Sequence, residues 1–129
     1  MLISGIYAGL CGVLLIVLSA RIIGMRRSYQ VGIGSGGHEE LARTIRVQGN
    51  FIEYTPIALI LLVLAELQGA SIWLVHGAGV LLVVGRGLHA FGLSQSAGRT
   101  FGRFYGTLST WASLLILVLT NLSAFFWAG

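Results

Sequence analysis

Residues 40–67 read ELARTIRVQGNFIEYTPIALILLVLAEL, and the change of character along this stretch decides the fold class. Its second part, from Phe51 to Leu67, is apolar apart from Glu53 and Glu66. A run of roughly 20 apolar residues is long enough for a helix to cross a bilayer. The stretch therefore predicts a membrane-spanning helix whose first turns are polar.

Three further apolar runs flank this one. Residues 1–20 and 104–128 carry no charge, and residues 70–91 carry Arg86 as their only Arg, Lys, Asp or Glu. Lipid offers no hydrogen bonds to the backbone, so helices are the expected form of each run. We predict an all-α protein, a bundle of four transmembrane helices in a single domain over residues 1–129, with helices at about 2–23, 39–67, 70–92 and 103–127.

The composition supports a surface that is covered by lipid. Hydrophobic residues make up 56% of the chain and charged residues 9%, and the mean hydropathy is +0.89. Soluble domains carry about 25% charged residues. The net charge of +4 comes entirely from arginines at the ends of apolar runs, which predicts a membrane topology signal and no nucleic-acid partner. The single cysteine, Cys11, excludes an internal disulfide.

The arginines also predict an orientation. Residues 21–46 hold five arginines and residues 92–103 hold Arg99 and Arg103, whereas the connection at 67–69 holds none. The positive-inside rule places the first and third connections in the cytoplasm and both termini on the non-cytoplasmic side. Trp73 and Trp127 suit the aromatic belt on that outer side.

A polar stripe climbs the second helix. At about 100° per residue, Arg43, Arg46, Asn50 and Glu53 fall within about 80° of one another, with Tyr54 beside them. Ionisable residues at membrane depth are costly unless they face a bundle interior or a wet cavity. One interpretation is an ion pair that locks the bundle. The other is a pocket for a small zwitterionic or anionic ligand, in which arginines bind carboxylates and Glu53 receives an ammonium group.

Basic groups on the third and fourth helices lie at the same level. Arg86 and His89 are three residues apart, and Arg86 either snorkels to lipid headgroups or packs inward between Gly85 and Gly87. Arg99 and Arg103 precede a stripe of small residues, Gly106, Thr110 and Ser113, that suits close helix packing, and headgroup binding is the plain alternative for both arginines. The three histidines, His38, His76 and His89, do not have the spacing of metal ligands, so no metal is predicted.

The stripe belongs to a longer pattern, E-x-x-R-x-x-R-x-Q-x-N-x-x-E-Y-x-P, formed by Glu40, Arg43, Arg46, Gln48, Asn50, Glu53, Tyr54 and Pro56. This pattern resembles the signature of the MAPEG family, the membrane-associated proteins in eicosanoid and glutathione metabolism. The order of helices and loops, with R-x-x-H and R-x-x-x-R before the last helix, extends the resemblance over the whole chain. The compact length is similar to the bacterial branch, whose members are largely inner-membrane proteins.

The resemblance implies a homotrimer that binds glutathione between neighbouring subunits, open to the cytoplasm. It implies that one subunit binds glutathione through Arg46, Asn50, Glu53 and Tyr54, and that Gln48, on the other face of the helix, contributes from the neighbour. By the same resemblance, the third helix contributes through Arg86 and His89, and the first helix through Arg21, near the carboxylates of glutathione.

The resemblance also implies a catalytic arginine near the start of the fourth helix. Arg103 is favoured for this role and Arg99 is the second candidate. A thiol has an unperturbed pKa of about 8.5, and a nearby guanidinium favours the nucleophilic thiolate. One departure is Leu93, where eukaryotic members often have a tyrosine, which implies fewer contacts to glutathione or a different ligand.

The leading hypothesis is a glutathione transferase, with peroxidase activity as a further expectation, that acts on hydrophobic, lipid-like electrophiles dissolved in the membrane. The alternative within the family is a non-catalytic lipid-binding or scaffold protein. A small transporter or channel subunit is a third hypothesis, but the polar residues gather at one end of the bundle rather than at the midplane, where transporters bind their substrates.

Overall fold

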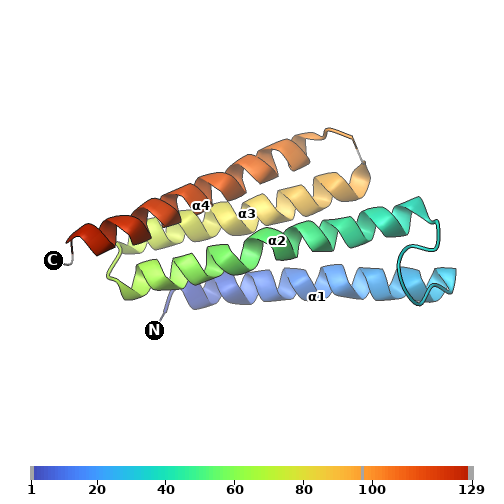
Figure 1. Cartoon of the computed structure of the whole chain (residues 1–129), viewed down its shortest axis with the longest axis horizontal. Coiled ribbons are helices and arrows are strands. Elements are labelled where there is room, and N and C mark those ends of the chain that lie inside the picture. The colour runs from blue at the N-terminus through green and yellow to red at the C-terminus, as the bar shows by residue number, and fades with distance from the viewer. Residues whose placement is uncertain (1, 97, 128–129) are drawn as a thin grey trace.

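Four long helices form the bundle in the computed structural model, which describes residues 2–96 and 98–127 and the side chains of these residues except 125 and 127. They are α1 (Ser4–Tyr29), α2 (Glu39–Leu67), α3 (Ile72–Gln95) and α4 (Phe101–Trp127). Successive helices run in opposite directions, so α1 begins and α4 ends at one end, and the 30–38 and 96–100 connections share the other end (Figure 1). The predicted four-helix fold is confirmed.

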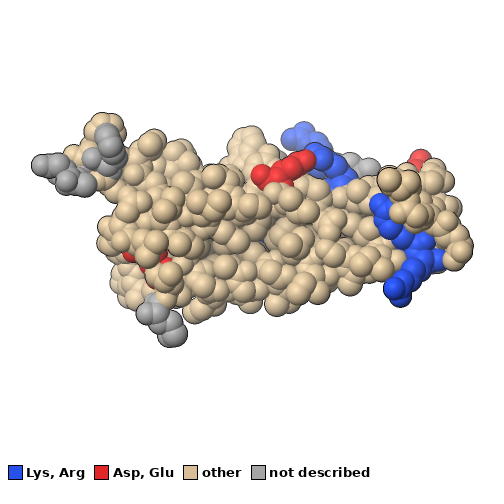
Figure 2. All heavy atoms as spheres, turned by 60° about the horizontal axis from the view of Figure 1, so that its bottom comes forward, with Lys and Arg blue, Asp and Glu red and all other residues tan. Residues whose placement is uncertain are grey.

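The outside of the bundle is apolar over most of its length. Large side chains such as Val13, Ile16, Leu115 and Leu119 are exposed, and each helix is long and apolar enough to cross a membrane. Arginines gather towards the end that carries the two longer connections, while most of the remaining surface in this view is uncharged (Figure 2). Lipid, rather than water, suits such a surface.

The helices α3 and α4 approach most closely, because glycines leave no side chains between their backbones. A Cβ atom placed on Gly106 would lie 2.6 Å from the carbonyl oxygen of Gly85, which is too short for real contacts. Ser113 Oγ donates to the carbonyl of Ala78 across the same interface at 2.8 Å. The small-residue stripe on α4, which includes Thr110, therefore packs against α3 as predicted.

Helix α1 is longer than expected and runs on to Tyr29 rather than ending near residue 23. Arg26 and Arg27 stabilise its last turn, where cations interact favourably with the helix dipole. The chain leaves the helix at Gln30, which has the left-handed φ of 56°. The ring of Tyr29 then stacks on His38 with centroids 4.1 Å apart, so the first connection is tied to the start of α2.

Glu66 has a role at the opposite end of the bundle that the sequence did not indicate. Its carboxylate accepts hydrogen bonds from the backbone N–H groups of Ile3 (2.6 Å) and Ser4 (2.8 Å), so it caps the start of α1. Tyr7 and His76 form a second link near this end, with Tyr7 Oη 2.7 Å from His76 Nδ1. Trp73 is exposed there. The side chain of Trp127, the other predicted belt residue, lies outside the described residues.

Candidate functional site

An ion pair lies on the outer face of α2. Arg46 Nη1 donates to Glu53 Oε1 at 2.8 Å, and Arg46 Nη2 donates to Glu53 Oε2 at 3.4 Å. The guanidinium therefore binds the carboxylate in a bidentate manner. The two side chains are seven residues apart, about two turns of helix. They remain 62% and 48% exposed in the isolated chain. Charges at this depth are costly against lipid, so this face requires a cover other than acyl chains.

Arg86 lies inside the bundle, 2% exposed, behind the polar stripe of α2. Its Nε donates to Thr110 Oγ1 at 2.9 Å, and its Nη1 donates to Asn50 Oδ1 at 2.7 Å. The ring of Tyr54 stacks on the guanidinium, 5.2 Å from ring centroid to Cζ. The headgroup alternative for Arg86 is therefore wrong, because Gly85 and Gly106 let α4 come close enough to cover the side chain.

His89 lies one turn beyond Arg86 and is also buried. Arg86 contacts Asn50 and Tyr54 of α2 and Thr110 of α4, so some of the predicted residues of α2 and α3 meet around one buried positive charge. On the outer face of α2, Glu53 supplies a carboxylate that can receive a cationic group.

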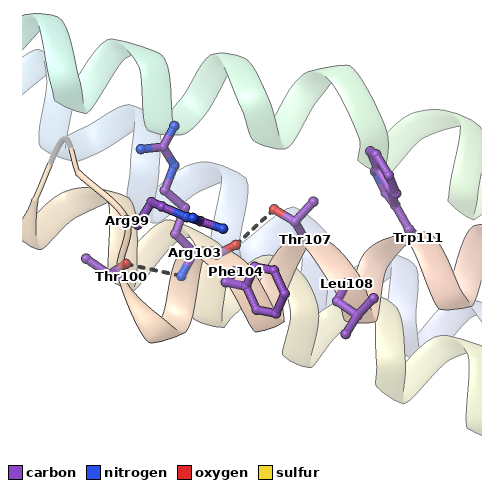
Figure 3. Close-up of a pocket in the computed structure, with 7 residues that line it drawn as sticks. All are labelled: Arg99, Thr100, Arg103, Phe104, Thr107, Leu108 and Trp111. Carbon is purple, nitrogen blue, oxygen red and sulfur yellow. Dashed lines mark hydrogen bonds between the residues drawn. The ribbon is translucent and has the colours of Figure 1, made fainter.

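Arg99 and Arg103 lie at one end of a pocket of about 430 Å³ along α4. Both arginine side chains lie at the same end of this pocket, and Trp111 lies at the other (Figure 3). Phe104 and Leu108 provide an exposed apolar wall between them. Arg103 Nη1 donates to the carbonyl of Gly98 at 3.1 Å, which holds the guanidinium near the 96–100 connection. The pocket therefore joins a cationic end to an apolar groove.

Two of the predicted binding residues lie apart from this cluster. Gln48 faces α1, where its Nε2 donates to Ser19 Oγ at 2.6 Å. Arg21 is exposed on α1. Within one chain, these residues do not join Asn50 and Glu53. Their predicted contribution from a neighbouring subunit stays a prediction.

Thr110 and Trp111 are parts of the site that sequence reasoning missed. Thr110 stood in the small-residue stripe as a packing residue, and its contact with Arg86 depends on the separation of α3 and α4. Trp111 belongs to no recognisable motif in the sequence. Leu93, at the position of the missing tyrosine, is buried in the core and offers no polar group. In residues 2–96 and 98–127, no three His, Cys, Asp or Glu side chains gather as a metal site would require.

Comparisons with known proteins identify the family of the chain. The model of the MAPEG family matches residues 4–123. The chain is 40% identical over 121 residues to the inner membrane protein YecN of Escherichia coli K12, covering 94% of this chain and 91% of the relative. YecN of Escherichia coli O6:H1 matches with the same identity and coverage. The family resemblance carried by the stripe on α2 is thus confirmed, and this chain belongs to the MAPEG family.

Proposed function

We propose that the protein is a glutathione transferase of the membrane, in which glutathione binds over the stripe of α2. The observation that carries the proposal is the exposed pair of Arg46 and Glu53 on an apolar helix, beside Asn50. Glutathione has two carboxylates, an ammonium group and amide bonds. Arginine is suited to the carboxylates, Glu53 to the ammonium, and Asn50 and Tyr54 to the neutral polar groups.

The reaction we propose is attack by the thiolate of glutathione on an apolar electrophile. A guanidinium near the sulfur favours the thiolate, and the proton leaves to solvent. The sulfur then forms a bond to carbon, and the electron pair moves to a leaving group or to a conjugated acceptor. Arg103 is the favoured partner of the sulfur and Arg99 the second candidate. Reduction of lipid hydroperoxides is a further proposed activity, in which two glutathione molecules become the disulfide while the hydroperoxide becomes an alcohol and water.

The pocket along α4 supports a substrate that arrives from the membrane. Its wall of Phe104, Leu108 and Trp111 is apolar, while Arg99 and Arg103 lie at its cationic end. A lipid-like electrophile could bind along this wall with its reactive carbon at the arginines. In this arrangement the apolar substrate and polar glutathione bind to different surfaces and meet at Arg99 and Arg103.

A homotrimer is part of the proposal. A second copy of the chain over α2 would remove the Arg46–Glu53 pair from lipid and could bring Gln48 and Arg21 to the same ligand. We also propose a bacterial inner-membrane location with the site open to the cytoplasm, since the relatives are inner membrane proteins and the arginines gather at that end.

Calorimetry with glutathione in detergent tests the proposed ligand. We expect heat of binding for the wild type. Affinity should fall at least about 10-fold for Arg46→Ala, because this change removes the guanidinium that binds a carboxylate of glutathione. Arg27→Ala is the matched control, because it removes an arginine from the last turn of α1, away from the stripe, and should leave binding unchanged. Absence of binding by the wild type would overturn the proposal. Conjugation of a model electrophile by the same sample then tests catalysis.

A non-catalytic lipid-binding role is the second candidate. It is favoured by Leu93, a buried leucine where eukaryotic relatives often have a tyrosine. In that case, the purified protein would bind an apolar ligand in the α4 pocket and show no conjugation. Ligand binding without turnover, at saturating glutathione, would decide for this alternative.

A further inference from the structure

The side-chain amide of Asn50 has a fixed direction. A guanidinium carries only N–H donors, so the Asn50 atom that lies 2.7 Å from Arg86 Nη1 must be the oxygen. The same Nη1 also reaches the Asn50 backbone carbonyl, at 3.3 Å. The amide nitrogen therefore points away from Arg86. This nitrogen donates no hydrogen bond to residues 2–96 and 98–127, and Asn50 is only half-buried.

Thr110 fixes Arg86 in turn. Its hydroxyl has one proton, which it donates to the carbonyl of Gly106 at 2.8 Å. Only its lone pairs remain for Arg86, whose Nε donates to them at 2.9 Å. Thr110 is fully buried, so water does not compete for this hydroxyl. Arg86 on α3 thus donates at both of its ends, through Nε to Thr110 on α4 and through Nη1 to Asn50 on α2.

We propose that Thr110 and Arg86 are positioning residues that keep the amide Oδ1 of Asn50 on Arg86 and thereby turn its Nδ2 donors towards the ligand. The proposal rests on the proposed function, because it concerns the same site. It specifies that the ligand places a carbonyl or carboxylate oxygen against Asn50. The carboxylate of Glu53 is the better partner for an ammonium group, so the two residues set the orientation of a zwitterionic ligand.

Two substitutions of Asn50 test the direction of its amide. Asn50→Asp keeps an acceptor for Arg86 and adds a counter-charge, so the melting temperature should equal or exceed that of the wild type. The same change removes the donor, and glutathione affinity should fall at least about 10-fold. Asn50→Leu leaves Arg86 without its acceptor and should lower the melting temperature. Wild-type affinity of Asn50→Asp, or a wild-type melting temperature of Asn50→Leu, overturns the proposal.

Thr110 is tested by rescue. Thr110→Val keeps the shape but loses the acceptor for Arg86, and glutathione affinity should fall about 5-fold or more, while Thr110→Ser should bind within about 2-fold of the wild type. Thr120→Val is the control, since Thr120 makes the same bond to the preceding turn (2.8 Å to Ile116 O) on the exposed face of α4. Equal losses for Thr110→Val and Thr110→Ser, or no loss for Thr110→Val, contradict the role.

These results separate the inference from the proposed function. Wild-type protein that does not bind glutathione overturns the ligand, yet the melting temperatures of Asn50→Asp and Asn50→Leu still decide the direction of the amide. Binding by the wild type together with full affinity of Asn50→Asp overturns the inference alone. If Thr110→Val does not fold, the results for Asn50→Asp and Asn50→Leu still support or overturn the proposal.

Discussion

A buried arginine with neutral partners is the most unusual residue of this protein. Burial of a charge costs several kcal/mol unless hydrogen bonds and a counter-charge compensate it. Arg86 receives its compensation from Asn50, Thr110 and the ring of Tyr54, while the carboxylate of Glu53 is bound to Arg46. The region therefore keeps an excess of positive charge, which favours an anionic ligand.

Glu53→Gln tests both interpretations of the stripe. Glutamine keeps the shape of the side chain but loses the charge that attracts Arg46 and an ammonium group. We expect at least about a 10-fold loss of glutathione affinity and a less stable oligomer, because the pair lies where another subunit would cover it. Calorimetry and a thermal melt in detergent measure the two effects. If neither quantity changes, the stripe is neither a ligand site nor a structural ion pair.

Arg103→Ala tests the catalytic role. A guanidinium that stabilises the thiolate acts on the chemical step, so kcat for a model electrophile should fall about 10- to 100-fold while glutathione affinity changes less. Arg99→Ala is the comparison, since both arginines lie at the same end of the α4 pocket. A larger loss of kcat for Arg99→Ala would transfer the role to that residue.

At the scale of helices, the approach of α3 to α4 positions the site. Glycines at 85 and 106 bring the two backbones together, and this separation lets Thr110 reach Arg86. Helix α2 contributes differently: its inner face packs on the core, while its outer face carries the ion pair. The site is therefore formed by the closely packed helices α3 and α4 together with α2, whose inner face is buried and whose outer face is charged.

Gly106→Ala should separate these helices. The added methyl group would meet the backbone of Gly85 and His89, and overpacking of this kind costs about 1–3 kcal/mol. We expect a lower melting temperature and weaker glutathione binding. Gly87→Ala is the matched control, because a Cβ there meets nothing within 4 Å, and it should leave stability unchanged or raise it. Equal melting temperatures for the two variants would contradict the importance of the close approach.

At the scale of the molecule, both chain ends share one end of the bundle and the arginines gather towards the other (Figures 1 and 2). The arrangement predicts that the 30–38 connection faces the cytoplasm. The only native cysteine, Cys11, is buried. Single new cysteines can therefore report the orientation.

Labelling of intact cells with a membrane-impermeant maleimide measures the orientation. Ser35→Cys, in the first connection, should react only after the membrane is permeabilised, whereas Ala70→Cys, in the second, should react in intact cells. The unaltered chain is the control for reaction at Cys11. Labelling of Ser35→Cys in intact cells would place the candidate site on the other side of the membrane.

The sequence by itself determined the class of fold and the family. Apolar runs long enough to cross a bilayer force helices, because lipid leaves backbone groups no other partner, and the spacing along residues 40–56 is periodic enough to place the stripe on one face. That spacing makes Arg46 a candidate partner for Glu53 on the same helix, and the structure shows that the two side chains pair.

Only the tertiary structure decided which side chains meet across helices. Arg86 could equally have reached the headgroups, and its burial depends on how closely α3 and α4 pack. The contacts of Thr110 with Arg86, Arg86 with Asn50, and Glu66 with the start of α1 join residues far apart in the chain. No local pattern encodes such contacts, because they depend on the rotation and separation of whole helices, which the packing of every side chain sets together.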